Sequence, residues 1–492
     1  MPMRKVIIYT SLLLLSATRA DAQTLTLDKA IQIAQENSFD AQVARFSFMA
    51  SYWTFRSYKA NLLPAMNLSG GLMNFNHSLV DARNYEDGRL QYVDNNTLSN
   101  SLTLSIDQNI AATGGTVSLQ SYLYRLDQFS YDEKTFNSQP FRISYHQPLM
   151  AFNSLKWERK SAPMEYEMAQ RKYMTAMENI TVRVSGLFFN AIAAQSNYKQ
   201  AVSTLSEREY LYEISRKRLE LGSTTKSEVL QLELSLLNSR VAVNDNRLSL
   251  EDAMYNLFSY LRVIDYDKAE LVPPSMVPDI IVGFEEVLQK AISNSPHTQE
   301  QKLQMLEAER TLAQAKADNR PKITINAEVG LSQTANAFNE AFSRMRDNEI
   351  VGVTLSLPIF DWGVRKGRVK MAKAQLDVVK TQIEQNHQDY VQELRRSVSQ
   401  FNAQPSQCLD ARRAQEIAEE RYDITRRRFE AGSISVTDLN TAQQELESAK
   451  MQYISQLQTF WTRYYSLRKA TLYDWIKGSD IAVDVEKIIN SH

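Results

Sequence analysis

One motif occurs twice in this chain, and the repetition constrains the fold more than any other feature. The segment RRRFEAGSISVTDL begins at Arg426, and RKRLELGSTTKSEVL begins 210 residues earlier, at Arg216. Both carry a basic triplet, a Gly-Ser pair and an acid six residues after the glycine. An internal repeat is read before any local motif, because it means that one structural unit is built twice.

The repeat extends on both sides of this motif. Residues 27–64 align without a gap onto 284–321 at a spacing of 257, whereas QPLMAFN at Gln147 matches LPIFDWG at Leu357 at 210. The two spacings differ by 47 residues, which must lie between Pro64 and Pro148. The chain is therefore a tandem duplication with one insertion. A signal peptide at 1–22 precedes the first repeat at 23–271, which has its strands within 64–150 and a turn near 222. A linker at 272–283 leads to the second repeat at 284–475, which has its strands within 322–360 and a turn near 432. A tail at 476–492 follows.

The first residues have the plan of a secretory signal. Arg4 and Lys5 precede an apolar run over 6–15, and small residues follow, which predicts cleavage between Ala22 and Gln23. The run is too short to span a hydrocarbon core of ~30 Å, and no later stretch reaches the ~18 apolar residues of a spanning helix. After export, such a chain enters a membrane with strands.

Apolar residues in both halves recur at helical spacing. In the second half they advance by steps of three and four, as in a coiled-coil seam: Leu439, Ala442, Leu446, Ala449, Tyr453, Leu457, Phe460, Tyr464 and Leu467. We predict long helices of ~100 Å, at 1.5 Å per residue, over 154–221 and 364–431, and shorter ones over 28–62 and 225–261. Pro163 and Pro405 should bend or break the long helices.

Other segments alternate with a period of two. The second half has two such segments, and the first half has four: 322–331 and 350–359, then 65–75, 98–110, 116–128 and 140–149. Alternation suits a strand between lipid and water, although a soluble sandwich shows it too, and the signal peptide favours the membrane. Closed membrane barrels start at about eight strands, so several chains must share one barrel.

Together these features resemble the TolC-like outer-membrane efflux protein family. The shared features are the paired turn motifs, NLLP and NRPK before the first strands, LPIFDWG after the last strand, and two halves over almost the whole chain. The resemblance implies a mainly α protein with a transmembrane β-barrel portion, in which a homotrimer forms an α-helical barrel and a shared β-barrel. The family usually has two strands per half, so the 47 extra residues either add a hairpin to the barrel, giving about 18 strands in a trimer, or form an appendage.

The resemblance also implies function and partners. It implies the outer-membrane channel of a tripartite efflux system, embedded in the outer membrane lipid of a Gram-negative cell with a large periplasmic part. A periplasmic adaptor and an inner-membrane pump of the RND or ABC type would open it at its helical tips. Type I protein secretion and metal-ion efflux use similar conduits, so the cargo stays open. A periplasmic coiled-coil adaptor without a pore is the competing class, against which two hairpins and strands in both halves argue.

The candidate site is the pair of turns. The predicted adaptor-docking residues are Leu221, Gly222, Ser223, Thr224, Ala431, Gly432, Ser433 and Ile434. By resemblance, Asp438 and Glu228 line the periplasmic mouth and favour cations, with Lys226 as a possible partner of Asp438. The alternative is that both acids only begin a helix, where negative charge suits the dipole. Phe429, Ile434 and Thr441 replace a Tyr, an Arg and a second Asp of the family pattern, so closure must use other contacts.

Composition argues against other functions. Lys and Arg number 56 against 57 Asp and Glu, which gives no electrostatic reason to expect nucleic acid. The five histidines lack metal-ligand spacing, and no phosphate loop or nucleophile motif occurs in a suitable context. We expect no enzyme activity, no cofactor and no metal site. The single Cys408 excludes an intrachain disulfide.

Overall fold

The computed structural model describes residues 24–83, 88–264, 269–274, 277–431 and 433–490. The predicted cleavage site at Ala22 and Gln23, and the turn residue Gly432, lie outside the described residues. The chain forms two compact units, which we call the tip unit (Met1–Ala44, Met174–Ala291 and Leu394–Ala482) and the sheet unit (Arg45–Tyr173, Ile292–Glu393 and Val483–His492). Among the described helices, none is both long and apolar enough to cross a bilayer.

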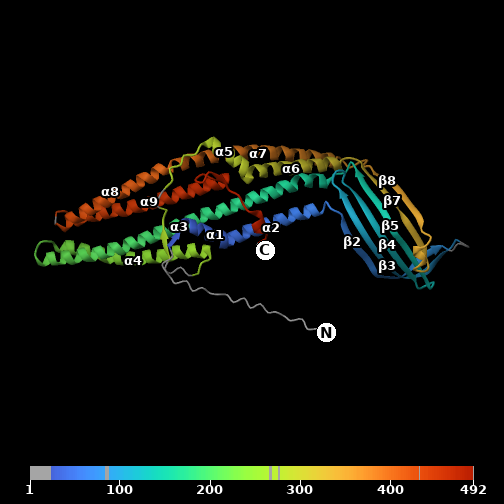
Figure 1. Cartoon of the computed structure of the whole chain (residues 1–492), viewed down its shortest axis with the longest axis horizontal. Coiled ribbons are helices and arrows are strands. Elements are labelled where there is room, and N and C mark those ends of the chain that lie inside the picture. Colours follow the sequence, from blue (N-terminus) through green and yellow to red (C-terminus); the bar gives the residue numbers. More distant parts are fainter. Residues whose placement is uncertain (1–23, 84–87, 265–268, 275–276, 432, 491–492) are drawn as a thin grey trace, which may run out of the picture. The chain divides into compact units, whose positions relative to one another are not determined.

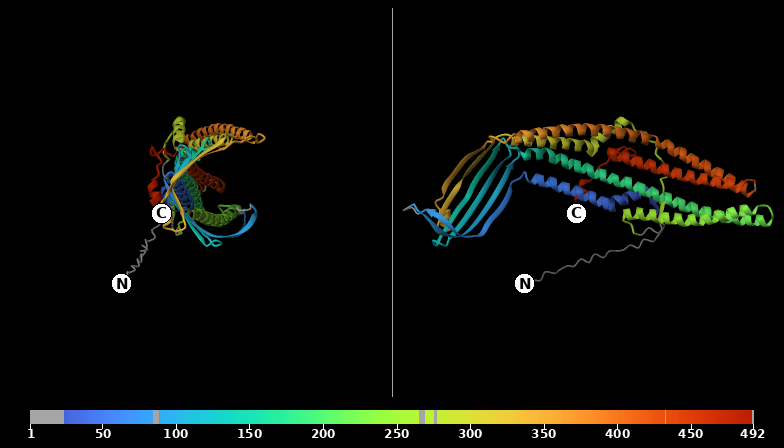
Figure 2. Two further views of the ribbon diagram at one scale, coloured as in Figure 1. Left: turned by 90° about the vertical axis from the view of Figure 1, so that its right-hand side faces the viewer. Right: turned by 180° about the vertical axis from the view of Figure 1, so that it is seen from behind.

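The sheet unit contains one antiparallel sheet of six strands in the order β2-β3-β4-β5-β7-β8 (Figures 1 and 2). Its strands are β2 Ala65–Arg83, β3 Leu90–Ile110, β4 Gly115–Gln128, β5 Glu133–Leu149, β7 Lys322–Ala335 and β8 Arg346–Ser356. The six expected strands are all present, and β2 and β3 extend well beyond the predicted segments. The insertion therefore contributes strands to the sheet. The unit also contains α6 Pro296–Asp318, η1 Glu340–Phe342 and α10 Val485–Asn490.

Two helical hairpins dominate the tip unit, and their turns lie at the same end of that unit (Figure 1). One hairpin pairs α3 (Ser154–Glu220) with α4 (Lys226–Leu261), and the other pairs α8 (Gln404–Glu430) with α9 (Val436–Thr471). Seven of the nine predicted seam residues of α9 are buried. The smaller elements of the unit are β1 Thr24–Thr26, α1 Leu27–Asn37, β6 Glu270–Val272, α5 Phe284–Asn294, β9 Tyr473–Asp474 and β10 Ser479–Asp480.

The predicted helix over 28–62 is wrong in one respect, because it breaks at Ser38 into α1 and α2 (Phe39–Ala60). The Ser38 amide donates to Ala34, and its hydroxyl accepts from the Ala41 amide at 3.2 Å. Ser295, which the repeat aligns with Ser38, also lies between two helices, α5 and α6, but its side chain forms no capping bond and Pro296 begins α6. A serine that bonds nearby backbone groups competes with the helical pattern, which explains the break at Ser38.

The prolines act differently in the two long helices. The second long helix is interrupted at Ala403, two residues before Pro405. Ala403 separates α7 (Val364–Asn402) from α8. Pro at the start of a helix loses no backbone bond, so Pro405 fits a new helix start. In contrast, α3 continues through Pro163 without a break. The expectation of a bend or break is confirmed at Pro405, whereas no break occurs at Pro163.

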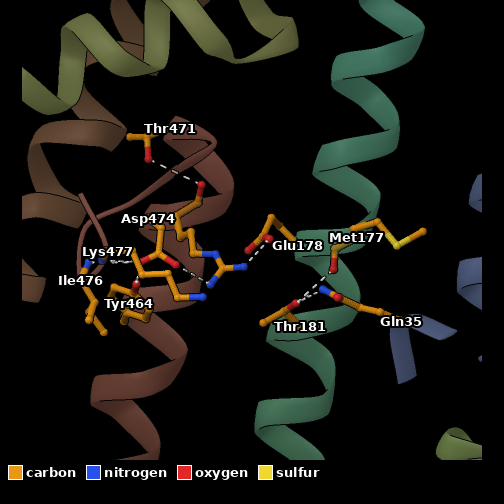
Figure 3. Close-up of polar contacts among 10 residues, drawn as sticks. Gln35, Met177, Glu178, Thr181, Tyr464, Thr471, Asp474, Ile476 and Lys477 are labelled. Atoms are coloured by element: carbon orange, nitrogen blue, oxygen red, sulfur yellow. Dashed lines mark hydrogen bonds and ion pairs between the residues drawn. The ribbon is translucent and has the colours of Figure 1, made fainter. Parts of the chain in front are cut away.

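A buried ion cluster anchors the segment after α9 (Figure 3). Arg468 donates to Glu178 of α3 at 2.8 Å and to Asp474 at 3.2 Å. Asp474 also accepts from the Tyr464 hydroxyl at 2.6 Å and from the amides of Ile476 and Lys477. Burial raises the pKa of Glu178, although the Arg468 hydrogen bond acts in the opposite direction. The cluster ties α3, α9 and the following turn together within the tip unit.

Candidate functional site

The first tip is a helix–turn–helix closed by a glycine in the left-handed region. Gly222 has φ 72°, where a side chain would be strained, and open space surrounds the position of a Cβ. The Ser223 amide donates to the Arg218 carbonyl at 2.9 Å and caps the end of α3. Leu221 is 82% exposed at the apex. The turn therefore presents an exposed apolar side chain beside a capped helix end.

A capping box begins α4 directly after this turn. Thr225 accepts from the Glu228 amide at 3.2 Å, and Glu228 accepts from the Thr225 amide at 3.3 Å. The Thr224 hydroxyl also donates to Glu228, and this bond is the main cause that lowers the pKa of the Glu228 carboxyl. Glu228 therefore stays ionised while it fixes the start of the helix.

The second tip is built in the same way. The Ala431 amide donates to Arg427 and the Ser433 amide to Arg428, at 3.0 and 2.9 Å, so the end of α8 is capped as that of α3 is. Gly432 itself lies outside the described residues, and Ile434 packs against the hydrophobic cluster below the turn. The two copies of the sequence motif thus form two capped turns in one unit.

Asp438 occupies the position that corresponds to Glu228. It accepts from the Ser435 hydroxyl at 2.8 Å and from the Ser435 amide at 3.1 Å, and its own amide donates back to Ser435 at 3.2 Å. The Ser435 hydroxyl, followed by its amide, lowers the pKa of the Asp438 carboxyl. The helix-start alternative thus describes what both acids do within one chain, and both keep a negative charge at the tips.

A hydrophobic cluster joins all four helices just below the tips. It consists of Leu211, Leu232, Phe429, Val436 and Leu439. Phe429, which stands where the family pattern has Tyr, is 4% exposed, and the Arg218 guanidinium lies 6.0 Å from its ring centre. Arg218 also donates to the Glu430 carbonyl at 3.0 Å. Apolar packing and one arginine therefore connect the two hairpins where the family pattern has a tyrosine.

A buried polar network connects the hairpins further from the tips, and sequence reasoning missed it. Arg208 of α3 donates to the Gln443 side chain of α9 at 2.6 Å, and both residues are buried. Gln443 in turn donates to Thr204 at 2.8 Å and to Glu447 at 3.1 Å. Burial lowers the pKa of Arg208, against the attraction of nearby carboxylates. The signal available in the sequence was Gln443, a polar residue four positions after the seam residue Leu439.

Neither the predicted site residue Lys226 nor Thr441, which replaces the family's second Asp, forms a bridge between the hairpins. Among the ion pairs of the described residues, none joins Lys226 to Asp438. Thr441 donates to the Thr437 carbonyl of its own helix at 3.0 Å. Instead, the Tyr422 hydroxyl of α8 donates to Glu207 of α3, and burial followed by this bond raises the pKa of Tyr422. Near the tips the hairpins are thus held together by Arg208, Arg218, Tyr422 and the apolar cluster.

Duplicated helical hairpins combined with a membrane-type antiparallel sheet define the class of outer-membrane channel proteins with a periplasmic helical part. The family model described as outer membrane efflux protein matches residues 30–261 and 287–471, so the chain belongs to that family. The resemblance seen in the sequence is confirmed. Family membership places the chain in the Gram-negative outer membrane, and members of the family are channels rather than enzymes.

Several characterised proteins are similar over most of the chain. Outer membrane protein TolC of Escherichia coli is 22% identical over 352 residues, which cover 66% of this chain and 69% of TolC. The probable efflux pump outer membrane protein TtgC of Pseudomonas putida is 22% identical over 460 residues, covering 91% of this chain and 83% of TtgC.

Solved structures show the same fold. The CmeC outer membrane channel of Campylobacter jejuni has a TM-score of 0.66 at 14% identity, covering 94% of this chain and 88% of CmeC. VceC of Vibrio cholerae has a TM-score of 0.63 at 16% identity, covering 93% of this chain and 97% of VceC.

Among the described residues, no group of three or more His, Cys, Asp or Glu side chains is placed to hold a metal ion.

Proposed function

We propose that three copies of this chain form the outer-membrane channel of a tripartite efflux system. The observation that carries the proposal is the pair of capped hairpin tips, joined within one unit by contacts that an opening motion would break. The names of TtgC, an efflux pump outer membrane protein, and of the CmeC channel support it. A periplasmic adaptor and an inner-membrane pump of the RND or ABC type complete the system.

Unpaired edges support the assembly of several copies. Among the described residues, the outermost strands of the sheet, β2 and β8, each pair with another strand on one side only. An open edge leaves backbone groups without partners in lipid, and six strands are fewer than the smallest closed membrane barrels contain. Pairing of β8 with β2 of the next copy closes the sheet. With three copies the result is the homotrimer that the family resemblance implies.

Apolar stripes on the helices support the same assembly. On α4, large apolar side chains remain exposed at heptad-like spacing: Leu230, Leu234, Leu237, Val241, Leu248 and Tyr255. On α8, Leu409, Ile417 and Ile424 are similarly exposed. Apolar seams of this kind pack against another helix, and both hairpins already bury a different face. Contact between the α4 stripe of one copy and the α8 stripe of the next would form a ring.

In this assembly the tips form the periplasmic mouth. Leu221, Ser223 and Thr224, with Ala431, Ser433 and Ile434 on the other hairpin, would dock the adaptor together with both turn glycines. Three Asp438 carboxylates would concentrate negative potential in the narrow opening and favour cations, with Glu228 contributing a second set. Lys226, at the first helical position of α4, would moderate that potential.

Extraction from the outer membrane and pore formation test the proposal. We expect that detergent, and not a high-salt wash, releases the full-length protein, and that the purified protein conducts ions in a planar bilayer. Release by salt without conductance would indicate a periplasmic adaptor instead.

A further inference from the structure

The insertion widens the sheet. The pairing register between the strands shows in which environment the extra strands lie. One residue from each of five neighbouring strands is paired in a row, and all five are apolar: Met66, Ile106, Leu119, Ile143 and Val329. The next row, one residue along and on the opposite face, is polar or glycine: Asn67, Ser105, Gln120, Arg142 and Gly330. Because side chains alternate across a strand, these five strands have one apolar and one polar face at this level.

The apolar face extends over β2 and β3 just as it does over β4, β5 and β7. Large apolar side chains on the two strands are exposed, among them Met66, Leu68, Phe75, Leu102 and Leu104. A soluble appendage would not present such a patch to water, whereas a barrel wall presents it to lipid. The first two strands are therefore part of the membrane wall.

Beyond Phe75 the same face is mixed. The pair His77–Asp94 at 2.9 Å lies on it with Asp81 and Arg83, and Leu79, Leu90 and Tyr92 alternate with these charged side chains. The pairing of β3 with β4 begins at Thr97, so residues 90–95 pair with β2 in the sheet. This part of β2 and β3 thus extends past the paired part of β4.

We propose that the membrane barrel has 18 strands and a wide lumen that does not limit the size of the cargo. The inference rests on the proposed trimer, since three six-stranded sheets supply 18 strands. With strands ~4.8 Å apart and tilted by ~40°, the backbone diameter is ~36 Å, against ~24 Å for two strands per half, or 12 in all. Side chains occupy ~5 Å on each side of the lumen, which leaves an open diameter of ~26 Å in the 18-stranded barrel and ~14 Å in the 12-stranded one.

The side chains on the polar face of the added strands support a wide lumen. Along β2 and β3 this face carries mostly small residues: Asn67, Ser69, Gly71, Ser101, Thr103 and Ser105. They fill little of the added space. The even number of antiparallel strands also lets β8 of one copy run antiparallel to β2 of the next, as closure requires. The tips, and not the membrane barrel, then set the size limit of the channel.

Cysteine labelling in intact cells measures the width. In a Cys408→Ala background, which removes the only native thiol, Ser144→Cys places a thiol on the polar face of β5, and Ile143→Cys places one on the apolar face. Each variant is treated from outside with a small charged maleimide and with a maleimide-tipped polymer of ~20 Å diameter, between the two calculated widths. We expect both reagents to label Ser144→Cys, and neither to label Ile143→Cys before the protein is unfolded.

The possible outcomes test the width of the barrel and the proposed channel function separately. Labelling of Ser144→Cys by the small reagent alone would overturn the 18-strand barrel and leave the proposed channel intact. Labelling by neither reagent would contradict the channel as well. Deletion of residues 78–124 removes the equivalent of the 47 extra residues, and in that variant the polymer should be excluded while the small reagent still reacts. If the shortened protein fails to reach the membrane, the size comparison in the full-length chain decides alone.

Discussion

The buried hydrogen bond between Arg208 and Gln443 predicts an asymmetric response to mutation. The Nη2–Oε1 distance is 2.6 Å, and the side chains are 6% and 4% exposed. Within the described part of the chain, the Nε and Nη1 atoms of Arg208 are buried without a hydrogen-bond partner. Gln443 is the acceptor for a cation that is otherwise poorly satisfied, whereas Gln443 itself has two further partners, Thr204 and Glu447.

The two single substitutions should therefore differ in cost. Gln443→Leu leaves the buried guanidinium without its acceptor, which costs about 3 kcal/mol or more. Arg208→Leu removes the charge together with its desolvation penalty, and apolar replacement of a buried charged group is often nearly neutral. In the double variant, Arg208→Leu should recover most of the loss caused by Gln443→Leu. Since 1.4 kcal/mol is tenfold, Gln443→Leu should shift the balance from joined to separated hairpins by more than about a hundredfold.

Single-channel open probability of the purified full-length protein measures this balance, because the bond links α3 of one hairpin to α9 of the other. A double-mutant cycle over the two positions gives the coupling. Arg240→Leu is the matched control. Arg240 forms an ion pair with Glu209 at 3.5 Å in which both side chains are exposed, and such pairs contribute little to stability. Equal effects of the two single substitutions, or strict additivity, would refute the argument.

Three further predictions concern the assembly and the tips. Mass measurement in mild detergent should give a trimer, and a stable monomer with pore activity would contradict the shared barrel. Replacing Gly222 and Gly432 together by Val should abolish export while the trimer remains in the membrane, because φ 72° at Gly222 disfavours a β-branched residue; normal export would exclude docking at the turns. Asp438→Asn should reduce cation selectivity and block by multivalent cations in channel recordings, and unchanged values would place the constriction elsewhere.

Periodicity predicted the elements because each of them buries one regular face. The α9 seam, the six strands and the start of α8 near Pro405 all follow from spacing or from a single backbone constraint. The break at Ser38 was missed, although the alignment had already paired Ser38 with Ser295. Each serine precedes a new helix; Ser38 caps its helix by accepting from the Ala41 amide, whereas Ser295 is followed by Pro296 at the start of α6. Repeated Asn-Ser pairs inside a long helical pattern were the available signal.

The candidate site was predictable in its turns and not in its contacts. The Gly-Ser pair and the acid six residues after the glycine specify a capped turn locally, so both tips could be derived from a short stretch of chain. The Arg208–Gln443 bond joins residues 235 positions apart. Nothing in either neighbourhood indicates the partner, because the register between α3 and α9 follows from packing of the whole unit. The same holds for Glu207 and Tyr422.

Capping and pore charge are compatible roles for Asp438, and the duplication provides the means to separate them. In both acids one carboxylate oxygen, Oδ2 or Oε2, accepts the capping bonds, and the hydroxyl partner lowers the pKa, so the cap preserves the negative charge. Glu228→Gln and Asp438→Asn therefore disturb nearly identical caps. A selectivity change confined to Asp438→Asn can arise only from where that carboxylate lies in the assembled mouth, whereas a change common to both variants fits either the altered helix start or the second set of carboxylates that Glu228 contributes.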